Sequence, residues 1–265
     1  KPAPIAAAAD SNPMLHPWTG PYEGVPPWDK LDPELFPDAF AKGMADVKAE
    51  VQAVIDTRTY EEGTFLFFAT KHGQVKKTKM SEYDSSLRTG LIAINLKEDD
   101  ELVRVVQTDG ESDIFMVSRN GQVIRFTEKE VRPMGRTAAG VRGMRLKAGD
   151  EVVSCDAGRD DDAMLIVSDA GYAKRTQIAQ FPRKGRGGQG VIGLKITNKK
   201  GHVVAAFMVG LEDEVVAIAS NGVTIRTEVK QISSQGRAAT GVRLMNLDDG
   251  AVVASVAPIL STDEE

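Results

Sequence analysis

The residues best suited to chemistry in this chain lie in three short loops in which glycines surround an arginine. The richest is Gly185–Val191, which reads GRGGQGV, and related loops occupy Gly135–Val141 and Gly236–Val242. Glycine lets the backbone approach a partner closely, so main-chain N–H groups and the guanidinium can face an anion, for which a phosphate chain is the natural candidate. One such loop could equally be a flexible surface turn. Its repetition at intervals of about 50 residues favours anion binding.

A second set of cations recurs at a fixed distance from a turn glycine. Gly73, Gly121, Gly171 and Gly222 are each followed four positions later by a basic residue. If the repeated units are arranged radially, these positions form a ring of positive charge on one surface. The alternative is ordinary charge on the solvent face of an antiparallel strand. Contacts from such residues to phosphate position a duplex without reading its sequence. The predicted phosphate-binding residues are Lys76, Lys77, Arg125, Arg136, Arg142, Lys174, Arg175, Arg183, Lys184, Arg186, Gly187, Gly188, Arg226 and Arg237.

The sequence offers no catalytic, metal or cofactor site. No Ser/His/Asp or Cys/His arrangement suited to nucleophilic catalysis is evident, and the one cysteine, Cys155, precedes an acidic run that disfavours its thiolate. His16, His72 and His202 lie too far apart for metal-ligand spacing, and no nucleotide phosphate loop is present. We therefore expect a non-catalytic protein without a metal or a cofactor. A single cysteine also rules out an internal disulfide and is consistent with a reducing compartment.

The net charge of −5 would normally argue against a polyanionic partner. Its distribution matters more than its sum. Residues 1–56 hold 4 basic and 9 acidic side chains, so residues 57–265 hold 33 − 4 = 29 basic and 38 − 9 = 29 acidic side chains. The repeat region is neutral as a whole, and any basic surface on it must come from segregation of charge.

The elements that must position these cations form a repeat of about 50 residues. Each unit opens with a β-rich run and a turn glycine, and continues into a second strand and the glycine–arginine loop. Two further strands, separated by an acidic or polar turn, close it. Four strands per unit at this period are typical of a propeller-like array. We predict a mainly β fold of four four-stranded antiparallel blades within residues 57–265, spanning about 62–110, 111–160, 161–211 and 212–260.

The first 56 residues differ in character from the repeats. Residues 1–31 are rich in proline, which predicts an extended arm, and residues 32–56 contain a predicted helix from about Asp38 to Val54. One side of this helix carries an apolar stripe that we expect to pack against the propeller or the arm. The stripe consists of Phe40, Met44, Val47 and Val51. No apolar run approaches the roughly 18 residues that span a bilayer, and no signal peptide is evident, so no membrane partner is expected.

The repeats resemble the C-terminal DNA-wrapping domain of DNA gyrase A, a β-pinwheel, over about residues 56–260. The resemblance rests on the pattern seen in Gly73–Thr78 and on the glycine–arginine loop that follows it, which this family shares with topoisomerase IV. Gyrase pinwheels typically have six blades with a QRRGGKG box in the first, and this chain resembles the last four. Lys184–Gly190, which reads KGRGGQG, is the nearest equivalent of the box; it lacks the leading Gln and has Gln189 in place of the box lysine.

Residues 1–55 resemble a different family. Asn12–Tyr22 and Gly24–Asp29 are similar to the N-terminal arm of the oligopeptidase A and peptidyl-dipeptidase zinc peptidases. Those enzymes need a helical His-Glu-x-x-His zinc motif, which this sequence lacks, so the resemblance implies no peptidase activity here. Together the two resemblances imply a hybrid whose parts are joined near Ala53–Arg58.

The resemblance to the gyrase domain implies a module that binds duplex DNA without sequence preference and bends or wraps it on a basic rim. It implies three partners, namely double-stranded DNA, the remainder of gyrase A, and gyrase B. These together form an ATP-dependent type II topoisomerase in the bacterial cytoplasm. The cleavage tyrosine of that family lies in a separate domain that this chain lacks, so no catalysis of its own is expected. The alternatives are a protein-interaction propeller and a topoisomerase IV-type C-terminal domain.

Overall fold

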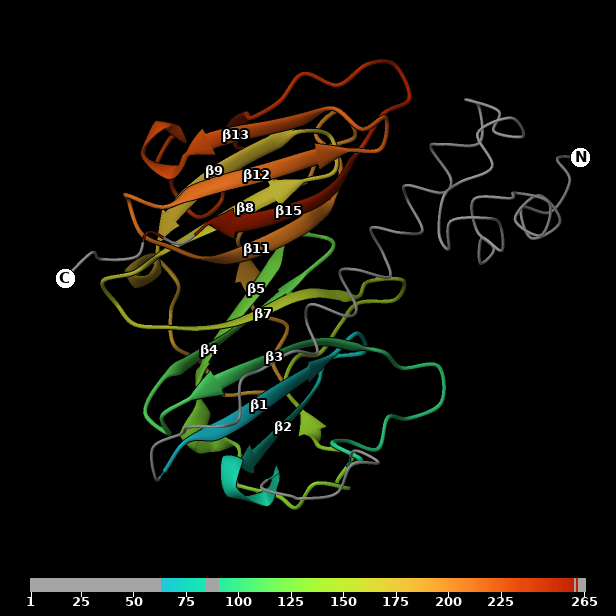
Figure 1. Cartoon of the computed structure of the whole chain (residues 1–265), viewed down its shortest axis with the longest axis vertical. Helices are drawn as coiled ribbons and strands as arrows, with labels where there is room; N and C mark the ends of the chain where they lie inside the picture. Colours follow the sequence, from blue (N-terminus) through green and yellow to red (C-terminus); the bar gives the residue numbers. More distant parts are fainter. Residues whose placement is uncertain (1–62, 84–90, 260, 262–265) are drawn as a thin grey trace, which may run out of the picture.

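The computed structural model describes residues 63–83, 91–259 and 261, and these residues form mainly β-strands (Figure 1). The arm predicted at 1–31 and the helix predicted at 38–54 lie outside the described residues. The strands form four antiparallel sheets, which we call blades 1 to 4 in chain order. Blade 1 lies at the bottom of Figure 1 and blade 4 at the top, so the four blades form one stack.

Three of the described blades contain four strands and one contains three. Blade 1 consists of β1 (Phe65–Thr70), β2 (Gln74–Lys79), β3 (Leu102–Thr108) and β6 (Val141–Arg142). Blade 2 consists of β4 (Asp113–Ser118), β5 (Gln122–Thr127), β7 (Val152–Gly158) and β10 (Val191–Ile192). Blade 3 consists of β8 (Ala163–Ser168), β9 (Tyr172–Gln177), β11 (Val203–Val209) and β14 (Val242–Arg243). Blade 4 consists of β12 (Glu214–Ala219), β13 (Thr224–Glu228) and β15 (Val253–Ile259).

A short 3-10 helix follows the second strand of each repeat. These helices are η4 (Met80–Tyr83), η5 (Glu128–Glu130), η6 (Ile178–Gln180) and η7 (Val229–Gln231). Within the part of the chain that the structure describes, no helix has the length and apolar character needed to cross a bilayer.

The outermost strand of blades 1, 2 and 3 is supplied by the following repeat. β6 pairs with β2, β10 with β5, and β14 with β9, and we call these three the exchanged strands. The residues after each exchanged strand also donate main-chain hydrogen bonds to the turn glycine of the preceding blade. Gly143 and Met144, for example, donate to the carbonyl of Gly73 over 2.8 and 3.1 Å. Each of these blades is therefore completed by its neighbour.

The two glycines that mark the repeat are required by this exchange. Gly73 has a φ of 80°, and a Cβ placed on it would lie 2.6 Å from the carbonyl oxygen of Met144. Gly241 also has a φ of 80°, and its Cβ would lie 2.9 Å from the carbonyl oxygen of Ala173. A side chain at either position would displace the neighbouring backbone. The sequence period therefore reflects the close packing of exchanged segments against turns.

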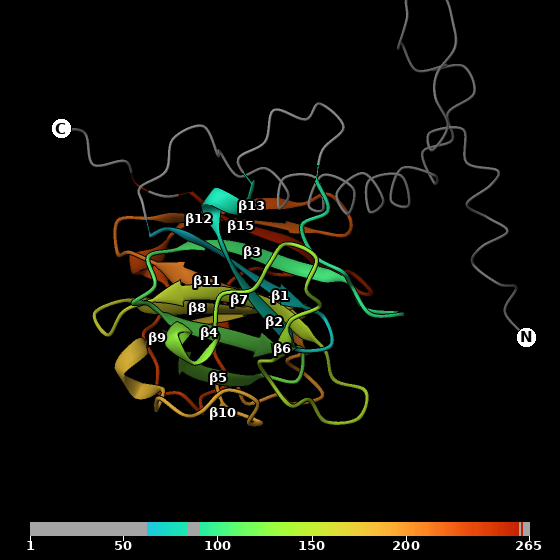
Figure 2. The same cartoon turned by 90° about the horizontal axis from the view of Figure 1, so that it is seen from below.

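The core lies between the blades. Alternate residues of a strand point to opposite faces of a sheet. In β4, Ile114 and Met116 accordingly pack with blade 1, while Phe115 and Val117 pack with blade 3. This explains the continuous apolar run, which is typical of a strand buried on both faces. The inner strands β3, β7, β11 and β15 contact one another in succession through the middle of the stack, as the two views show (Figures 1 and 2).

The mainly β, propeller-like fold class is confirmed, with one difference in detail. Blade 4 has three strands among the described residues instead of the predicted four. In this architecture the outermost strand comes from the next repeat, and blade 4 is the last blade among the described residues. The prediction counted four strands per repeat, but the repeat pattern does not show that one of these strands joins the sheet of the preceding blade.

Candidate nucleic-acid interface

The cations predicted to form a ring on the outer surface lie mostly inside the molecule. Lys77, Arg125 and Arg175 are 4%, 5% and 8% exposed. The chain of the next repeat lies against their strands and covers them. Arg226 lies in the last described blade, where it is exposed and pairs with Glu214 of its own blade. The prediction of a continuous outer ring is therefore wrong for Lys77, Arg125 and Arg175.

These buried cations balance buried acids and link neighbouring blades. The Nε atom of Arg125 donates to Asp113 of its own blade over 2.6 Å, and its Nη1 atom donates to the carbonyl of Phe181, in the next repeat, over 3.2 Å. Lys77 in blade 1 lies 3.2 Å from the carboxylate of Glu128, which follows blade 2's β5. A buried charge is tolerated when it is paired and hydrogen-bonded. The fixed position of the cation thus serves assembly of the propeller.

Lys76 and Lys174 are also buried, at 0% exposure each, which contradicts their predicted place on the surface. Lys174 donates to the carbonyls of Gly236 and Arg237 over 2.8 and 2.7 Å, and Lys76 donates in the same way to the carbonyl of Arg136. Burial lowers the pKa of both ammonium groups to about 8. Each lysine therefore holds the glycine–arginine loop of the following repeat from within.

The loop arginines clamp the exchanged strands. Arg186 is exposed, and its Nη1 atom donates to the carbonyl of Arg142 in β6 over 3.0 Å, while its Nε atom donates to the carbonyl of Glu130 over 3.0 Å. Arg237 repeats the arrangement one blade later, since its Nη1 atom donates to the carbonyl of Ile192 in β10 over 3.1 Å. Both guanidinium groups thus reach back to the exchanged strand of the preceding repeat.

Two main-chain amides of the glycine-rich loop are already hydrogen-bonded within the protein. The amide of Arg186 donates to the carboxylate of Glu130 over 2.9 Å, and the amide of Gly187 donates to the carbonyl of Gly143 over 2.6 Å. Gly188 offers its carbonyl to the amide of Arg145. The loop packs against the preceding repeat instead of forming an empty cradle. The amides of Arg186 and Gly187 are therefore not available to an anion.

The remaining predicted residues divide by exposure. Arg142 and Lys184 are exposed, and Arg136 is half-buried. Arg183 is exposed, and its Nη2 atom donates to Asp113 over 2.9 Å; this hydrogen bond raises the pKa of the guanidinium. Arg142 and Lys184 are thus accessible to solvent, whereas Arg183 already neutralises an internal acid.

Exposed cations collect along the exchanged strands, the residues after them and the glycine–arginine loop before β10. Because the exchanged strands are the outermost strands of their sheets, this charge lies along the outer edge of blades 1 to 3. We call this set the basic rim. It consists of Arg142, Arg145, Lys184, Arg186, Lys195 and Arg243, all of them exposed.

Three members of the basic rim, Arg145, Lys195 and Arg243, were not among the predicted binding residues. They follow the loop-closing glycines Gly140, Gly190 and Gly241 by five, five and two positions. The signal was available in that spacing. Its meaning depends on knowing that the segment after each of these glycines becomes an outermost strand of the preceding blade.

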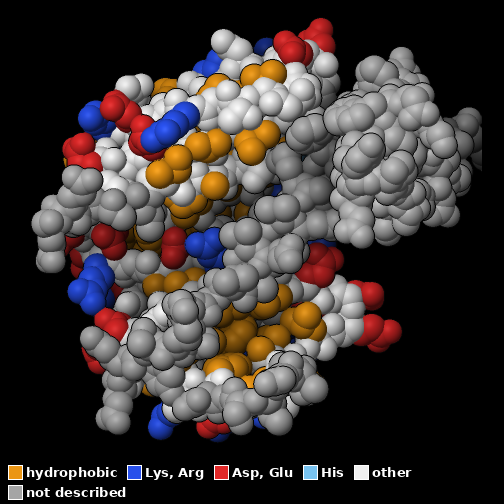
Figure 3. Space-filling model, viewed as in Figure 1, with side chains coloured by type: hydrophobic (Ala, Val, Ile, Leu, Met, Phe, Trp, Pro, Cys, Tyr) orange, Lys and Arg blue, Asp and Glu red, His pale blue; other side chains and the backbone are white. Residues whose placement is uncertain are grey.

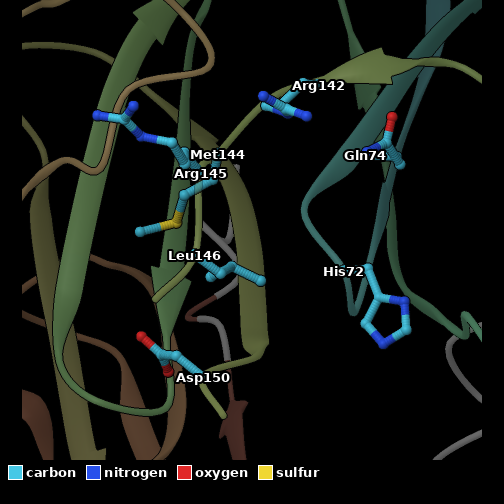
Figure 4. A pocket seen from close by; sticks show the side chains of 7 residues that line it. All are labelled: His72, Gln74, Arg142, Met144, Arg145, Leu146 and Asp150. Carbon is cyan, nitrogen blue, oxygen red and sulfur yellow. The ribbon is translucent and has the colours of Figure 1, made fainter. Parts of the chain in front are cut away.

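The rim is hollowed between blades 1 and 2 into a groove of about 460 Å³. Figure 4 shows Arg142 and Arg145 in its upper part and His72 and Asp150 in its lower part. The carboxylate of Asp150 accepts hydrogen bonds from the hydroxyl of Ser118 and the main-chain amide of Asn120 in the turn of blade 2. Its oxygens are therefore already occupied by protein donors. The two guanidinium groups are therefore the groups in this groove best placed to meet an anion. The groove is lined by His72, Gln74, Arg142, Met144, Arg145, Leu146 and Asp150.

A family model described as the DNA gyrase C-terminal domain, a beta-propeller, matches the chain in four consecutive segments. The matched residues are 64–109, 112–157, 162–209 and 213–259, one segment for each repeat. The chain belongs to this family.

Relatives in this gyrase family include the DNA gyrase A protein of Mycobacterium leprae, which is 43% identical over 209 residues. That match covers 78% of this chain and 16% of the relative. The DNA gyrase A protein of Mycolicibacterium smegmatis is 42% identical over 216 residues, which cover 81% of this chain and 26% of the relative. The chain thus spans about a quarter or less of the length of these relatives.

Two solved structures share the fold. The C-terminal domain of DNA topoisomerase IV superposes with a TM-score of 0.72 at 29% identity, covering 77% of this chain and 64% of the other. The DNA gyrase A C-terminal domain superposes with a TM-score of 0.69 at 26% identity, covering 77% of this chain and 68% of the other. The family match and the sequence relatives both carry the gyrase name, so the topoisomerase IV-type alternative is not the better supported one.

Proposed function

We propose that this chain binds duplex DNA without sequence preference and bends it along the basic rim. The observation that carries the proposal is the segregation of cations in a neutral domain. The strand cations Lys76, Lys77, Arg125, Lys174 and Arg175 are buried, while the exposed rim cations share the outermost strands and loops of successive blades. A phosphate backbone is the polyanion that such a row of cations suits.

The contacts expected on the rim are to phosphate and not to base edges. Arginine and lysine side chains on an outer sheet edge position a duplex without reading its sequence. Bending a site of 20–30 base pairs by 40–90° costs on the order of 1–6 kcal/mol, so several rim cations must act together to offset it. Cations distributed over three blades meet this requirement better than a single cluster would.

In this proposal, DNA cleavage and supercoiling are carried out by a larger assembly of which this chain is one part. The relatives carry the name DNA gyrase A, and this chain covers only a part of them. We assign DNA cleavage and ATP-dependent supercoiling to the remainder of gyrase A and to gyrase B, with which this chain would act in the bacterial cytoplasm. The chain itself contributes DNA binding and no catalytic residue, metal or cofactor.

The test is the salt dependence of binding to two linear duplexes of equal length and unrelated sequence. We expect similar affinities for both and a log–log slope of about −0.9 for each phosphate neutralised. The variant Arg142→Gln/Arg145→Gln should weaken binding to both duplexes and make the slope shallower by about 0.9 for each arginine removed.

The matched control is Arg159→Gln. Arg159 is an exposed arginine in the turn after β7, outside the basic rim, where it pairs with Asp109. We expect this variant to bind DNA as the parent does. Binding that does not depend on salt, or a double rim variant that binds as well as the Arg159→Gln control, would contradict the proposal.

A further inference from the structure

The three exchanged strands are received in one register. In each case the second residue after the turn glycine is paired with the first residue after the loop-closing glycine. The acceptor residue is buried by this pairing, with an exposure of 0% for Val75, 1% for Val123 and 0% for Ala173. The three pairs are Val75 with Val141, Val123 with Val191, and Ala173 with Val242. The chain thus contains its own template for how a blade accepts a strand.

Blade 4 has the acceptor edge of this template without an exchanged strand among the described residues. Its equivalent positions, Val223 and Thr224, are exposed, Val223 to 46%. The face of blade 4 that would meet a following blade is also incompletely covered, since Val216 and Ile218 are half-buried where Phe115 and Val117 of blade 2 are 0% and 2% exposed. Figure 3 shows apolar side chains at the surface over β12 and β15.

The first repeat has the complementary feature. Leu91–Ile92 stands at the position of the exchanged strands, directly after the loop-closing Gly90. In the structure this segment is outside any described strand, and Ile92 is 62% exposed. The three other segments of this type pair with the preceding blade, whereas Leu91–Ile92 pairs with none of the described strands.

We propose that β13 of one copy of this chain accepts Leu91–Ile92 of a second copy. The template register places Thr224 opposite Leu91 and Val223 opposite Ile92, so two exposed apolar side chains cover each other. The donor and the acceptor lie at opposite ends of the stack of blades, which is why a second copy supplies the strand (Figure 1). The contact does not depend on DNA binding.

The chemistry of both segments suits this pairing. An edge strand presents unpaired main-chain N–H and C=O groups and is a template for another strand. Threonine at the acceptor position and the β-branched Ile92 and Val223 are strand formers. Because the donor and the acceptor are different surfaces, the contact is head-to-tail, and association continues beyond the dimer unless the rotation closes a ring.

Cross-linking between two single-cysteine variants tests the register. Directly opposed residues of an antiparallel pair lie within the Cα separation that a disulfide spans. We expect a mixture of full-length Ile92→Cys and Val223→Cys chains to form a covalent dimer under mild oxidation. The native Cys155 can remain, because it is 1% exposed and burial raises the pKa of its thiol.

The control mixture contains Ile92→Cys and Val252→Cys. Val252 is 46% exposed and precedes β15, on the side of β12 away from β13. We expect no mixed dimer in this control. Equal cross-linking in the two mixtures would overturn the proposal. A double variant with both cysteines, Ile92→Cys/Val223→Cys, that cross-links within one chain at high dilution would also overturn it, because the stack would then close on itself.

Sedimentation of the full chain tests the acceptor edge. We expect the weight-average mass of the parent to rise with concentration, and Thr224→Lys to abolish that rise because pairing would bury the ammonium group. Thr224 is exposed in the single copy, so the substitution leaves the blade intact. The matched variant Val252→Lys should associate as the parent does. A parent chain that stays monomeric at every concentration, or equal association of both variants, would refute the proposal.

Discussion

Arg186 illustrates how one side chain can stabilise the fold and meet a ligand. Its guanidinium is exposed, yet two of its nitrogen atoms donate to the carbonyls of Glu130 and Arg142. Arg237 makes the corresponding bond to Ile192. A phosphate that approaches Arg186 therefore meets a guanidinium already oriented by the protein. For this reason, loss of DNA binding on mutating Arg186 would not separate a direct contact from a loosened exchanged strand.

Stability measurements make that separation. We expect Arg186→Ala to lower the free energy of unfolding by about 1–2 kcal/mol, because it removes two side-chain hydrogen bonds that hold β6 and the segment before it. Arg145→Ala should change it by no more than about 0.5 kcal/mol, since Arg145 is exposed and its hydrogen bond to the carbonyl of Gly188 comes from its main-chain amide. Urea-induced unfolding of both variants is the measurement. Equal stability of the two variants would show that the clamp contributes nothing.

The burial of the strand cations marks the limit of sequence reasoning at this scale. The sequence predicts a cation at a fixed place in each repeat, and the structure has one there. Whether it faces solvent depends on a segment about 50 residues further along the chain. Arg125 is 5% exposed because the next repeat covers it, whereas Arg226, in the last described blade, is exposed. Nothing in the local pattern distinguishes the two.

At the scale of the elements, strand exchange joins the repeats. An exchanged strand contains only two residues, so its pairing alone contributes little. The hydrogen bonds to the turn glycine, the clamp by the loop arginine and the buried side chain after the strand act at the same place. Met144 is such a side chain, at 1% exposure between blades 1 and 2. A substitution that displaces one of these contacts is therefore expected to disturb the others.

Gly73→Ala tests this coupling. The new Cβ would lie 2.6 Å from the carbonyl oxygen of Met144, and alanine would also have to adopt a φ of 80°. Gly149→Ala is the matched control, with a φ of 74° and no atom within 4 Å of its Cβ. We expect thermal unfolding to give about 1–2 kcal/mol of destabilisation for the control, from backbone conformation alone. Gly73→Ala should lower the free energy of unfolding by more than twice as much. Equal losses for the two variants would mean that the exchanged segment can shift away from the new Cβ at little cost.

The repeat period was sufficient to predict the elements but not their exchange. Apolar runs bounded by glycines indicated the strands, and the spacing of Gly73, Gly121, Gly171 and Gly222 indicated four units. A period gives the number of strands in a unit and is silent on which blade receives each one. For this reason the period could not predict that blade 4 has three described strands or that Leu91–Ile92 lies outside any described strand.

At the scale of the whole molecule, the fold converts a neutral sequence into a surface with separated charge. Residues 57–265 carry equal numbers of acidic and basic side chains. Packing between blades removes part of the basic set from the surface, and exchange carries another part to the outermost strands. The basic rim therefore follows from the architecture and not from an excess of basic residues. It spans three blades, which is the distribution that a bent duplex requires.

The most direct test of DNA bending is energy transfer between dyes at the two ends of a short linear duplex, with and without the chain. We expect saturating protein to raise the energy transfer, because phosphates along one side of the duplex follow the basic rim. At a concentration that gives equal occupancy, Arg142→Gln/Arg145→Gln should raise it less than the parent does, and Arg159→Gln should match the parent. A duplex that is fully bound by the parent chain with unchanged energy transfer would contradict the account.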